Sequence, residues 1–433
     1  MKDGTIHVHY LTRVEGHGNI HVEVEGGALK AFRWEIPEAP RFFEAMVRGQ
    51  SYADVAHIVS RICGICSIGH TLCALQAVEN ALGVRPSEQT VLLRKLLLHG
   101  ETVQSHVLHA GYLAAPDFFG VPSVVPLVAS HREAVLTIVR LHRLANEWCD
   151  QIGGRTTHPI TPVVNGWTRL PTPEELANLR ARIEAGMADA WALVEIFRTL
   201  DIPDFQRPTE YIALKHPEEY AFYEGVIAST DGDTTAVPDY RQKVHEFVVP
   251  YSTSKRARAN RNSFAVGALA RFNNNAEQLS PQAKKAAEAL GLRPICTNPF
   301  LNTVAQVVEV VHALEDSLRL IDLLLARGIE PEVPWVQVRA GRGVGAVEVP
   351  RGILFHEYTL DETGHVVDAN MIIPTGQNHQ NIEDDMAVLI PQILDRPEEE
   401  IRLRLEMLVR AYDPCISCST HLLHLELRGG KSR

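Results

Sequence analysis

The chain has 433 residues, of which 45% are hydrophobic and 22% charged, so it is long and apolar enough to bury a substantial core. Its formal net charge of −11, without a long basic run, argues against a surface that neutralises nucleic-acid phosphates. Its apolar stretches fall well short of the roughly 18 consecutive apolar residues of a membrane-spanning helix, so we expect no membrane span.

The first predicted elements are strands. Apolar and polar residues alternate within residues 4–36, as at Ile6, Val8 and Tyr10, and glycines punctuate the pattern. Such alternation is typical of strands with one buried face. We therefore expect a small antiparallel sheet in this N-terminal β region.

Helical periodicity then takes over. Apolar residues recur at helical spacing over residues 67–83, 87–114, 130–152, 173–198, 281–290, 299–327 and 397–412. Strand-like patterns return over residues 334–339, 345–349, 353–360 and 365–373, and the loop-rich stretches are 201–262 and 328–350. The sequence predicts one mainly helical α+β domain over residues 1–433, with small peripheral β-sheets and a helical bundle whose interior can hold a buried cofactor.

Two Cys-x-x-Cys pairs stand near opposite ends of the chain. Cys63 and Cys66 lie in the segment RICGICSIGH, and Cys415 and Cys418 lie in DPCISCSTH. This spacing lets two thiolates converge on one metal. A structural four-cysteine zinc site fits it, soft thiolates also suit nickel and iron, and a redox pair of thioredoxin type needs a βαβ context that we do not find. Spacing alone leaves the metal open.

The redox setting follows from the remaining composition. Seven cysteines are an odd number and too few for a disulfide scaffold, and the N-terminus has no visible signal peptide. We therefore expect a reducing, cytoplasmic location, in which cysteines serve more often as metal ligands or catalytic groups than as bridges.

The two cysteine motifs together resemble the signature pair of the large, catalytic subunits of NiFe hydrogenases. Other segments resemble the family in the same order, so that the likeness covers essentially the whole chain: Arg13-Val14-Glu15-Gly16-His17, Arg41-Phe42-Phe43-Glu44, Val349-Pro350-Arg351-Gly352 and Ile373-Pro374-Thr375 followed by Asn378. Ser417, Asn298-Pro299-Phe300 and Phe264-Ala265-Val266-Gly267-Ala268 are most similar to the soluble multimeric hydrogenases that include the sulfhydrogenase alpha subunits.

The resemblance implies a nickel–iron centre that carries CO and two cyanides and cleaves H2 reversibly and heterolytically into protons and electrons. Cys63 and Cys415 would be terminal thiolates on nickel, and Cys66 and Cys418 would bridge nickel and iron. Cys415 would be the first proton acceptor. Glu15 would be the next relay, because a buried carboxyl can exchange a proton near neutral pH.

The same resemblance assigns residues around that centre. Pro350, Arg351 and Thr375 would bind the cofactor: Arg351 would lie above the metals and donate to a cyanide, and Thr375 would donate to the other cyanide. Asp117 and Asp413 would pair with Arg351, so that a buried cation is compensated. His70 would donate a hydrogen bond near a bridging thiolate. Glu44 and His421 match a second, harder cation site that holds Mg²⁺ or iron.

The remaining cysteines predict a partner. Cys73, Cys149 and Cys296 cannot supply the four thiolates of an ordinary iron–sulfur cluster. Electrons must therefore leave through another polypeptide, an iron–sulfur small subunit in an obligate heterodimer. A flavoprotein module that reduces NAD(P) is the expected next partner, and a heterodisulfide-reductase or ferredoxin-linked complex is the alternative.

Two further expectations concern maturation and competing functions. The family's large subunit is cut after the last histidine by a maturation endopeptidase once nickel-insertion proteins have loaded the metal, so residues 422–433 would be a removable peptide. A tail that stays as a terminal strand is the other interpretation. The competing functions are a structural zinc protein and a non-catalytic relative, such as the complex I quinone-site subunit, which generally lacks the four cysteines.

Overall fold

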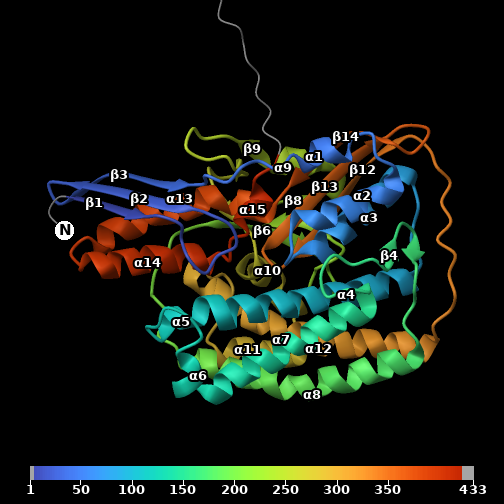
Figure 1. Cartoon of the computed structure of the whole chain (residues 1–433), viewed down its shortest axis with the longest axis horizontal. Coiled ribbons are helices and arrows are strands. Elements are labelled where there is room, and N and C mark those ends of the chain that lie inside the picture. The colour runs from blue at the N-terminus through green and yellow to red at the C-terminus, as the bar shows by residue number, and fades with distance from the viewer. Residues whose placement is uncertain (1–3, 422–433) are drawn as a thin grey trace, which may run out of the picture.

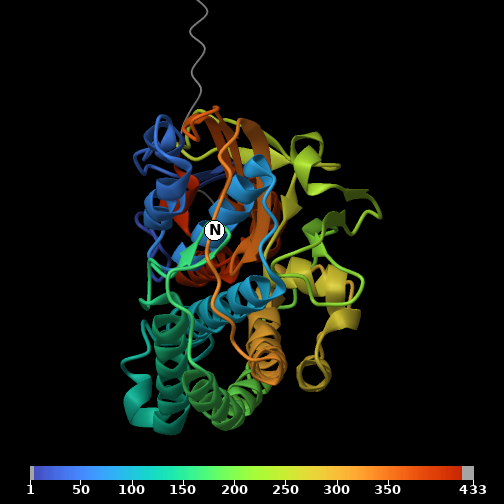
Figure 2. The same cartoon turned by 90° about the vertical axis from the view of Figure 1, so that its right-hand side faces the viewer.

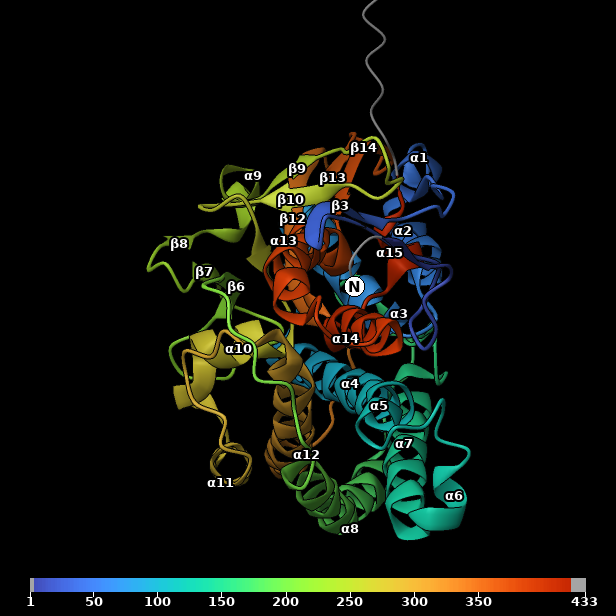
Figure 3. The same ribbon diagram turned by 90° about the vertical axis from the view of Figure 1, so that its left-hand side faces the viewer.

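Four long helices form the lower half of the molecule in Figure 1. This computed structural model describes residues 4–421. Each long helix packs on two of the others in a closed bundle, seen nearly end-on in Figure 3. The four helices are α4 (Glu88–Val107), α7 (Arg132–Gly153), α8 (Pro173–Arg198) and α12 (Asn302–Arg327). Helix α8 begins where the sequence predicts, because Thr172 and Glu175 form a reciprocal capping box ahead of its first turn.

The helix expected over residues 87–114 is interrupted near its end. Helix α4 passes into a π-helical turn, Leu108–Ala114, and then into the short helix α5 (Ala115–Phe118). A Cβ on Gly111 would lie 2.5 Å from the Cγ2 of Ile138, so the glycine lets this turn pack closely on α7. Such turns often mark functional sites. Here it carries His109 toward the C-terminal cysteine motif.

The upper half is built on a three-stranded antiparallel sheet of β12 (Gly341–Val349), β13 (Gly352–Leu360) and β14 (Val366–Ile372). Helix α3 (Ser67–Leu82) lies against β12 and β13. It comes close because β12 has glycines at Gly343 and Gly345, where a Cβ would lie 2.1 and 2.3 Å from backbone oxygens of α3. This contact brings the N-terminal cysteine motif beside the β12–β13 turn.

The N-terminal β region is confirmed as an antiparallel sheet of β1 (Gly4–Val8), β2 (Asn19–Glu25) and β3 (Ala28–Glu35). The other strands are β4 (Pro162–Val163), β5 (Gly166–Trp167), β6 (Glu210–Lys215), β7 (Val226–Ser229), β8 (Thr234–Thr235), β9 (His245–Phe247), β10 (Arg256–Arg258) and β11 (Phe264–Ala265). The other helices are α1 (Phe43–Val47), α2 (Tyr52–Val59), α6 (Leu127–Ser130), α9 (Tyr240–Lys243), α10 (Ala268–Asn275), α11 (Pro281–Ala289), α13 (Pro374–Ile393), α14 (Glu398–Ala411) and α15 (Ile416–Ser419).

The architecture is the expected α+β arrangement of many helices with small sheets, but some local predictions differ. Residues 334–339 form no strand. They belong to an extended segment that runs between α12 and β12 (Figure 2) without pairing into a sheet. Residues 201–262 are less irregular than expected, because they contain β6 to β10. Within residues 4–421, no helix is long and apolar enough to cross a membrane.

Candidate metal centre

Four cysteine side chains converge where the upper sheet, α3 and the C-terminal motif meet. The Sγ atoms of Cys63, Cys66, Cys415 and Cys418 all lie within 4.8 Å of one another, and all four side chains are buried. The Sγ atoms of Cys63 and Cys415 are 3.4 Å apart. The two ends of the chain therefore form one four-thiol site, as the paired motifs predict.

Backbone contacts fix the thiols locally. The Sγ of Cys63 accepts the N–H groups of Ile65 and Cys66, each at 3.2 Å, which curls the first motif around its own sulfur. In the second motif, the N–H of Cys415 donates to the Oγ1 of Thr375 at 2.9 Å. Thr375 lies in the first turn of α13, so that helix holds Cys415 in place.

The pKa values of the four cysteine thiols differ in direction from the ordinary value. Hydrogen bonds from Cys415, Cys418 and Cys66 hold the pKa of the Cys63 thiol well below its ordinary value. Burial raises the pKa values of the Cys415 and Cys418 thiols. Four buried thiolates would repel one another strongly, so the fully deprotonated set requires a bound cation.

A guanidinium lies beside the thiols. Arg351 lies in the β12–β13 turn and is buried. It donates from Nε to the backbone oxygen of Asp413 at 2.7 Å and from Nη2 to the Oδ1 of Asp413 at 2.8 Å. Burial opposes its charge, but Asp413 and the cysteine thiolates outweigh burial and hold the pKa of Arg351 well above its ordinary value. Its Nη1 is buried and has no hydrogen-bond partner among the described residues.

Hydrogen bonds from a second buried arginine hold the turn that carries Arg351 in place. Arg271 of α10 donates to the backbone oxygens of Val349 at 2.9 Å and of Pro350 at 3.0 Å. Arg271 itself forms ion pairs with Glu309 and Glu348, and all three side chains are fully buried. Pro350, expected to bind the cofactor, thus contributes its carbonyl to the support of Arg351.

Glu15 contacts the second cysteine motif directly. The Cys415 thiol donates to its Oε2 at 3.2 Å, and the hydroxyl of Ser417 donates to its Oε1 at 2.6 Å. The N–H of Ser417 also donates to Oε2 at 3.1 Å. The Glu15 backbone forms a parallel bridge with Cys415, and the N–H of Ile416 donates to the backbone oxygen of Glu15 at 2.9 Å. A half-buried carboxylate is therefore in direct hydrogen-bond contact with a site thiol.

The expected pairing of Asp117 with Arg351 is wrong. Asp117 accepts from Arg410, at 2.7 Å from Nε and 2.9 Å from Nη2, and it also contacts Arg13. Asp413 alone of the two aspartates pairs with Arg351 in the described structure. The reason is geometric: the π-helical turn ends before α5 and leaves Asp117 facing α14 and the N-terminal segment.

His70 is buried in α3, and its Nδ1 lies 3.1 Å from the Nε2 of His356. Its Nε2 is buried and has no hydrogen-bond partner within residues 4–421. Burial lowers the pKa of His70 to about 4, so the ring is neutral at pH 7. The expected contact of His70 with a bridging thiolate is not among its hydrogen bonds, which leaves Nε2 as the atom available for it.

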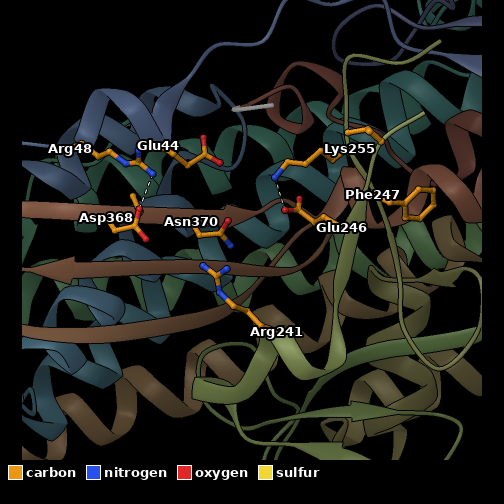
Figure 4. Close-up of a pocket in the computed structure, with 10 residues that line it drawn as sticks. Glu44, Arg48, Arg241, Glu246, Phe247, Lys255, Asp368 and Asn370 are labelled. Atoms are coloured by element: carbon orange, nitrogen blue, oxygen red, sulfur yellow. Dashed lines mark hydrogen bonds and ion pairs between the residues drawn. The ribbon is translucent and has the colours of Figure 1, made fainter. Parts of the chain in front are cut away.

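Glu44 and His421 meet, as the resemblance expects. His421 Nδ1 forms a short contact with the Glu44 Oε1, and both side chains are buried. Burial raises the pKa of Glu44, but His421 outweighs it and leaves that pKa below its ordinary value. Glu44 also lines a cavity of about 490 Å³ whose wall is rich in charge (Figure 4). There Lys255 pairs with Glu246, and Arg48 pairs with Asp368.

Several supporting residues escaped the sequence analysis. Glu101 of α4 accepts the N–H of Ile68 at 2.7 Å and of Gly69 at 3.0 Å, which caps α3 just after the first cysteine motif. Gln306 of α12 donates to the Oδ2 of Asp413 at 3.0 Å. A lone Glu or Gln in a helical pattern carries no signal of such a contact. Only the helix packing brings these side chains to the site.

Comparisons with known proteins point to one family. A family model described as nickel-dependent hydrogenase matches residues 41–160 and 207–421. Sulfhydrogenase 1 subunit alpha of Pyrococcus furiosus is 33% identical over 422 residues, which cover 97% of this chain and 98% of that protein. Sulfhydrogenase 2 subunit alpha of the same organism is 34% identical over 422 residues, with 96% and 98% covered.

A solved structure agrees with these relatives. The crystal structure of an NAD+-reducing [NiFe]-hydrogenase in the H2-reduced state superimposes with a TM-score of 0.87 at 26% identity. The match covers 96% of this chain and 99% of that one. The similarity therefore extends over nearly the whole length of both chains and includes both cysteine motifs.

Proposed function

Because this chain belongs to the nickel-dependent hydrogenase family, as a catalytic subunit and an oxidoreductase, we propose that its four cysteines hold a nickel–iron centre that carries CO and two cyanides. Cys63, Cys66, Cys415 and Cys418 would each supply a thiolate to hold the two metals. When bound, this centre supplies the reversible heterolytic cleavage of H2 into protons and electrons. The membership also argues against the structural zinc site that spacing alone left open.

The residues at the site fit such a centre. Four soft thiols in a buried cluster suit nickel and iron. The decisive observation is the Nη1 of Arg351, a buried cationic donor without a partner among the described residues beside that cluster. An unpaired buried donor is costly, and an anionic ligand such as cyanide would satisfy it.

The chain's own groups provide a proton path. The Cys415 thiol already donates to Glu15, so a proton on this sulfur has an acceptor 3.2 Å away. Ser417 holds the other carboxylate oxygen through its hydroxyl. We propose that Cys415 accepts the proton first and Glu15 relays it outward, with Ser417 keeping the carboxylate in position.

Arg351, Asp413 and Thr375 are the proposed polar surroundings of the centre. Asp413 accepts from the Nε and Nη2 of Arg351, so Nη1 is the donor left for the site, whose thiolates are close enough to act on the charge of Arg351. The Thr375 oxygen accepts from Cys415, which leaves its hydroxyl hydrogen to donate to a second cyanide. His70, through Nε2, is the proposed donor to a bridging thiolate.

Glu44 and His421 are the proposed protein ligands of a second cation, Mg²⁺ or iron. A buried carboxylate and an imidazole already face each other there, and a cation between them would replace their direct contact. This site joins the last residue of the second cysteine motif to α1. It would therefore fix the end of the motif that carries Cys418.

We propose an iron–sulfur small subunit as an obligate partner. Cys73 and Cys149 are buried singly, and the cysteine cluster is the one group of three or more converging metal-ligand side chains within residues 4–421. The chain thus offers no cluster site of its own to carry electrons away in its described part. Similarity to an NAD+-reducing enzyme supports a cytoplasmic flavoprotein module that exchanges electrons with NAD(P).

The maturation proposal concerns residues 422–433, which lie outside the described residues. We propose that an endopeptidase removes them after nickel-insertion proteins have acted. Mass spectrometry of the mature, nickel-loaded subunit tests this directly. A mass that still includes Ser432 and Arg433 would refute the cleavage.

An infrared spectrum of the purified complex tests the central proposal. Side chains and backbone absorb weakly in the metal–CO and metal–cyanide stretching window. One CO band with two cyanide bands is the expected result, with nickel and iron found by metal analysis. A correctly processed complex that contains zinc and shows no such bands would overturn the proposal.

A further inference from the structure

Three buried side chains form a line from the cysteine site into the central sheet. His70 of α3 is followed by His356 of β13, with Nδ1 and Nε2 3.1 Å apart. The Nδ1 of His356 lies 2.6 Å from the hydroxyl oxygen of Tyr358, two residues along the same strand. All three side chains are fully buried. They meet because the glycines of β12 let α3 approach the sheet.

The chemistry of imidazole couples the three groups. A neutral imidazole donates through one nitrogen and accepts through the other. Both rings are buried beside each other, and a charge on either is opposed by desolvation and by the neighbouring ring, so both are neutral. The proton position on His356 therefore determines the proton position on His70. The proton position on His356 in turn depends on whether the hydroxyl of Tyr358 donates to this ring or accepts from it.

Two arrangements satisfy both hydrogen bonds. If the Nδ1 of His356 donates to Tyr358, the phenol proton has no acceptor among the described residues, and the Nε2 of His70 presents a lone pair. If Tyr358 donates to His356, then His356 donates to His70, and the Nε2 of His70 carries the remaining N–H. Each arrangement leaves one donor without a partner among the described residues.

The location of the donor without a partner decides which of the two arrangements is favoured. In the first arrangement it lies at Tyr358, in the interior of the sheet. In the second it lies at the Nε2 of His70, on a ring close enough to Cys63 for the charge of that thiolate to act on it. A donor is stabilised beside negative charge, whereas a lone pair is destabilised there. The second arrangement is therefore the favourable one.

We propose that Tyr358 and His356 are positioning residues that fix the proton of His70 on Nε2, so that His70 presents an N–H to the cysteine site. This inference rests on the proposed function, in which the cysteines are metal-bound thiolates. A hydrogen bond to such a thiolate withdraws electron density from it and so tunes the metals. Tyr358 acts on the site only through the two histidines.

Substitution of Tyr358 by Phe tests the proposal in the purified holoenzyme complex. Tyr358→Phe keeps the ring but removes the donor, which frees the two histidines to reverse their hydrogen bond. The expected result is a shift of the CO and cyanide bands by several wavenumbers, or a second set of bands. The matched control is Tyr223→Phe, which removes a buried hydroxyl that accepts from Arg94 and should leave the bands in place.

Neutron diffraction from crystals of the deuterated wild-type complex gives an independent readout. It should show deuterium on the Nε2 of His70 and on the Nε2 of His356. Deuterium on the Nδ1 of His70, or bands that Tyr358→Phe leaves unchanged, would overturn the inference. A wild-type spectrum without CO and cyanide bands would instead refute the proposed function, so the two failures are distinguishable.

Discussion

The thiol of Cys415 donates to the carboxylate of Glu15 at 3.2 Å, although 400 positions separate the two residues along the chain. The two backbones also pair, because the N–H of Ile416 donates to the backbone oxygen of Glu15. The contact is thus fixed twice, once by side chains and once by main chain. A proton leaving this sulfur meets one defined acceptor.

Glu15→Gln should keep the metal centre but block this proton step. Glutamine occupies the same volume and retains hydrogen bonds, but it does not take up and release a proton near neutral pH. We expect H/D exchange to fall by about 10² or more, the usual contribution of a positioned acid–base group, with unchanged nickel content and infrared bands. Glu25→Gln, in an exposed pair with Lys30, is the control. Full exchange activity in Glu15→Gln would refute the relay.

Ser417→Ala should have a smaller effect on the same step. It removes the 2.6 Å hydrogen bond to Glu15, but the Ser417 N–H still holds the other carboxylate oxygen. A hydrogen bond to a charged group contributes about 1.5–3 kcal/mol. Because the Ser417 N–H still holds the carboxylate, we expect the loss to fall at the lower end of this range, so that exchange slows by about tenfold. Ser417→Thr keeps a hydroxyl and should retain most of the rate. Equal losses in both variants would show that the hydroxyl is not the group that matters.

Arg351→Lys should impair activity without loss of metal. Lysine keeps the charge but cannot donate in three fixed directions, two toward Asp413 and one toward the site. We expect H2 oxidation per nickel to fall by roughly 10²-fold, as for removal of a preorganised donor. Arg342→Lys, in a half-exposed pair with Glu357, is the control. Unchanged activity in Arg351→Lys would exclude a role for the guanidinium shape.

The sequence predicted the cysteine cluster, the Arg351–Asp413 pair and the meeting of Glu44 with His421, because each lies in a motif that resembles the family. The prediction that Asp117 pairs with Arg351 was wrong for a physical reason. Two buried arginines compete for the aspartates of this region, and only the path of the chain after the π-helical turn decides which is within reach. No spacing along the sequence contains that information.

Fold prediction failed in a similar way at two segments. Helix α13 was missed because its buried face carries polar residues such as Gln377, Asn378 and His379, which hide the apolar period. Residues 334–339 were predicted as a strand because Val336 and Val338 alternate with polar residues. A strand also needs a neighbour to pair with, and this segment has none in the described structure.

Asp117→Asn should reduce stability rather than chemistry. The Asp117 side chain is 3% exposed and compensates Arg410 and Arg13, so its neutralisation leaves Arg13 without its carboxylate and Arg410 with Glu406 as its remaining ion-pair partner among the described residues. Loss of one partner from a buried pair costs about 3–5 kcal/mol. We expect a clearly lower melting temperature with H2 oxidation per nickel preserved. Asp189→Asn, which breaks a more exposed pair with Arg140, should change little. A normal melting temperature with lost activity would instead place Asp117 in the reaction.

Glu309→Gln should weaken the support of the Arg351 turn in a pH-dependent way. Burial opposes the charge of Glu309, but Arg271 and His106 outweigh it and lower its pKa from 4.5 to about 2. A carboxylate with a depressed folded-state pKa contributes stability above its unfolded pKa and loses it as the pH falls toward the folded value. The melting temperature of Glu309→Gln should therefore lie below that of the wild type at pH 7.

The difference in melting temperature between Glu309→Gln and the wild type should shrink as the pH falls from about 4.5 toward 2, because protonation removes the same charge from the wild type. Thermal melts of the purified complex between pH 7 and pH 3 measure the gap. Glu184→Gln, in an exposed pair with Arg180, should show a small difference that does not vary with pH. A melting-temperature difference for Glu309→Gln that stays constant over this range would mean that the carboxylate charge of Glu309 does not stabilise the buried Arg271 network.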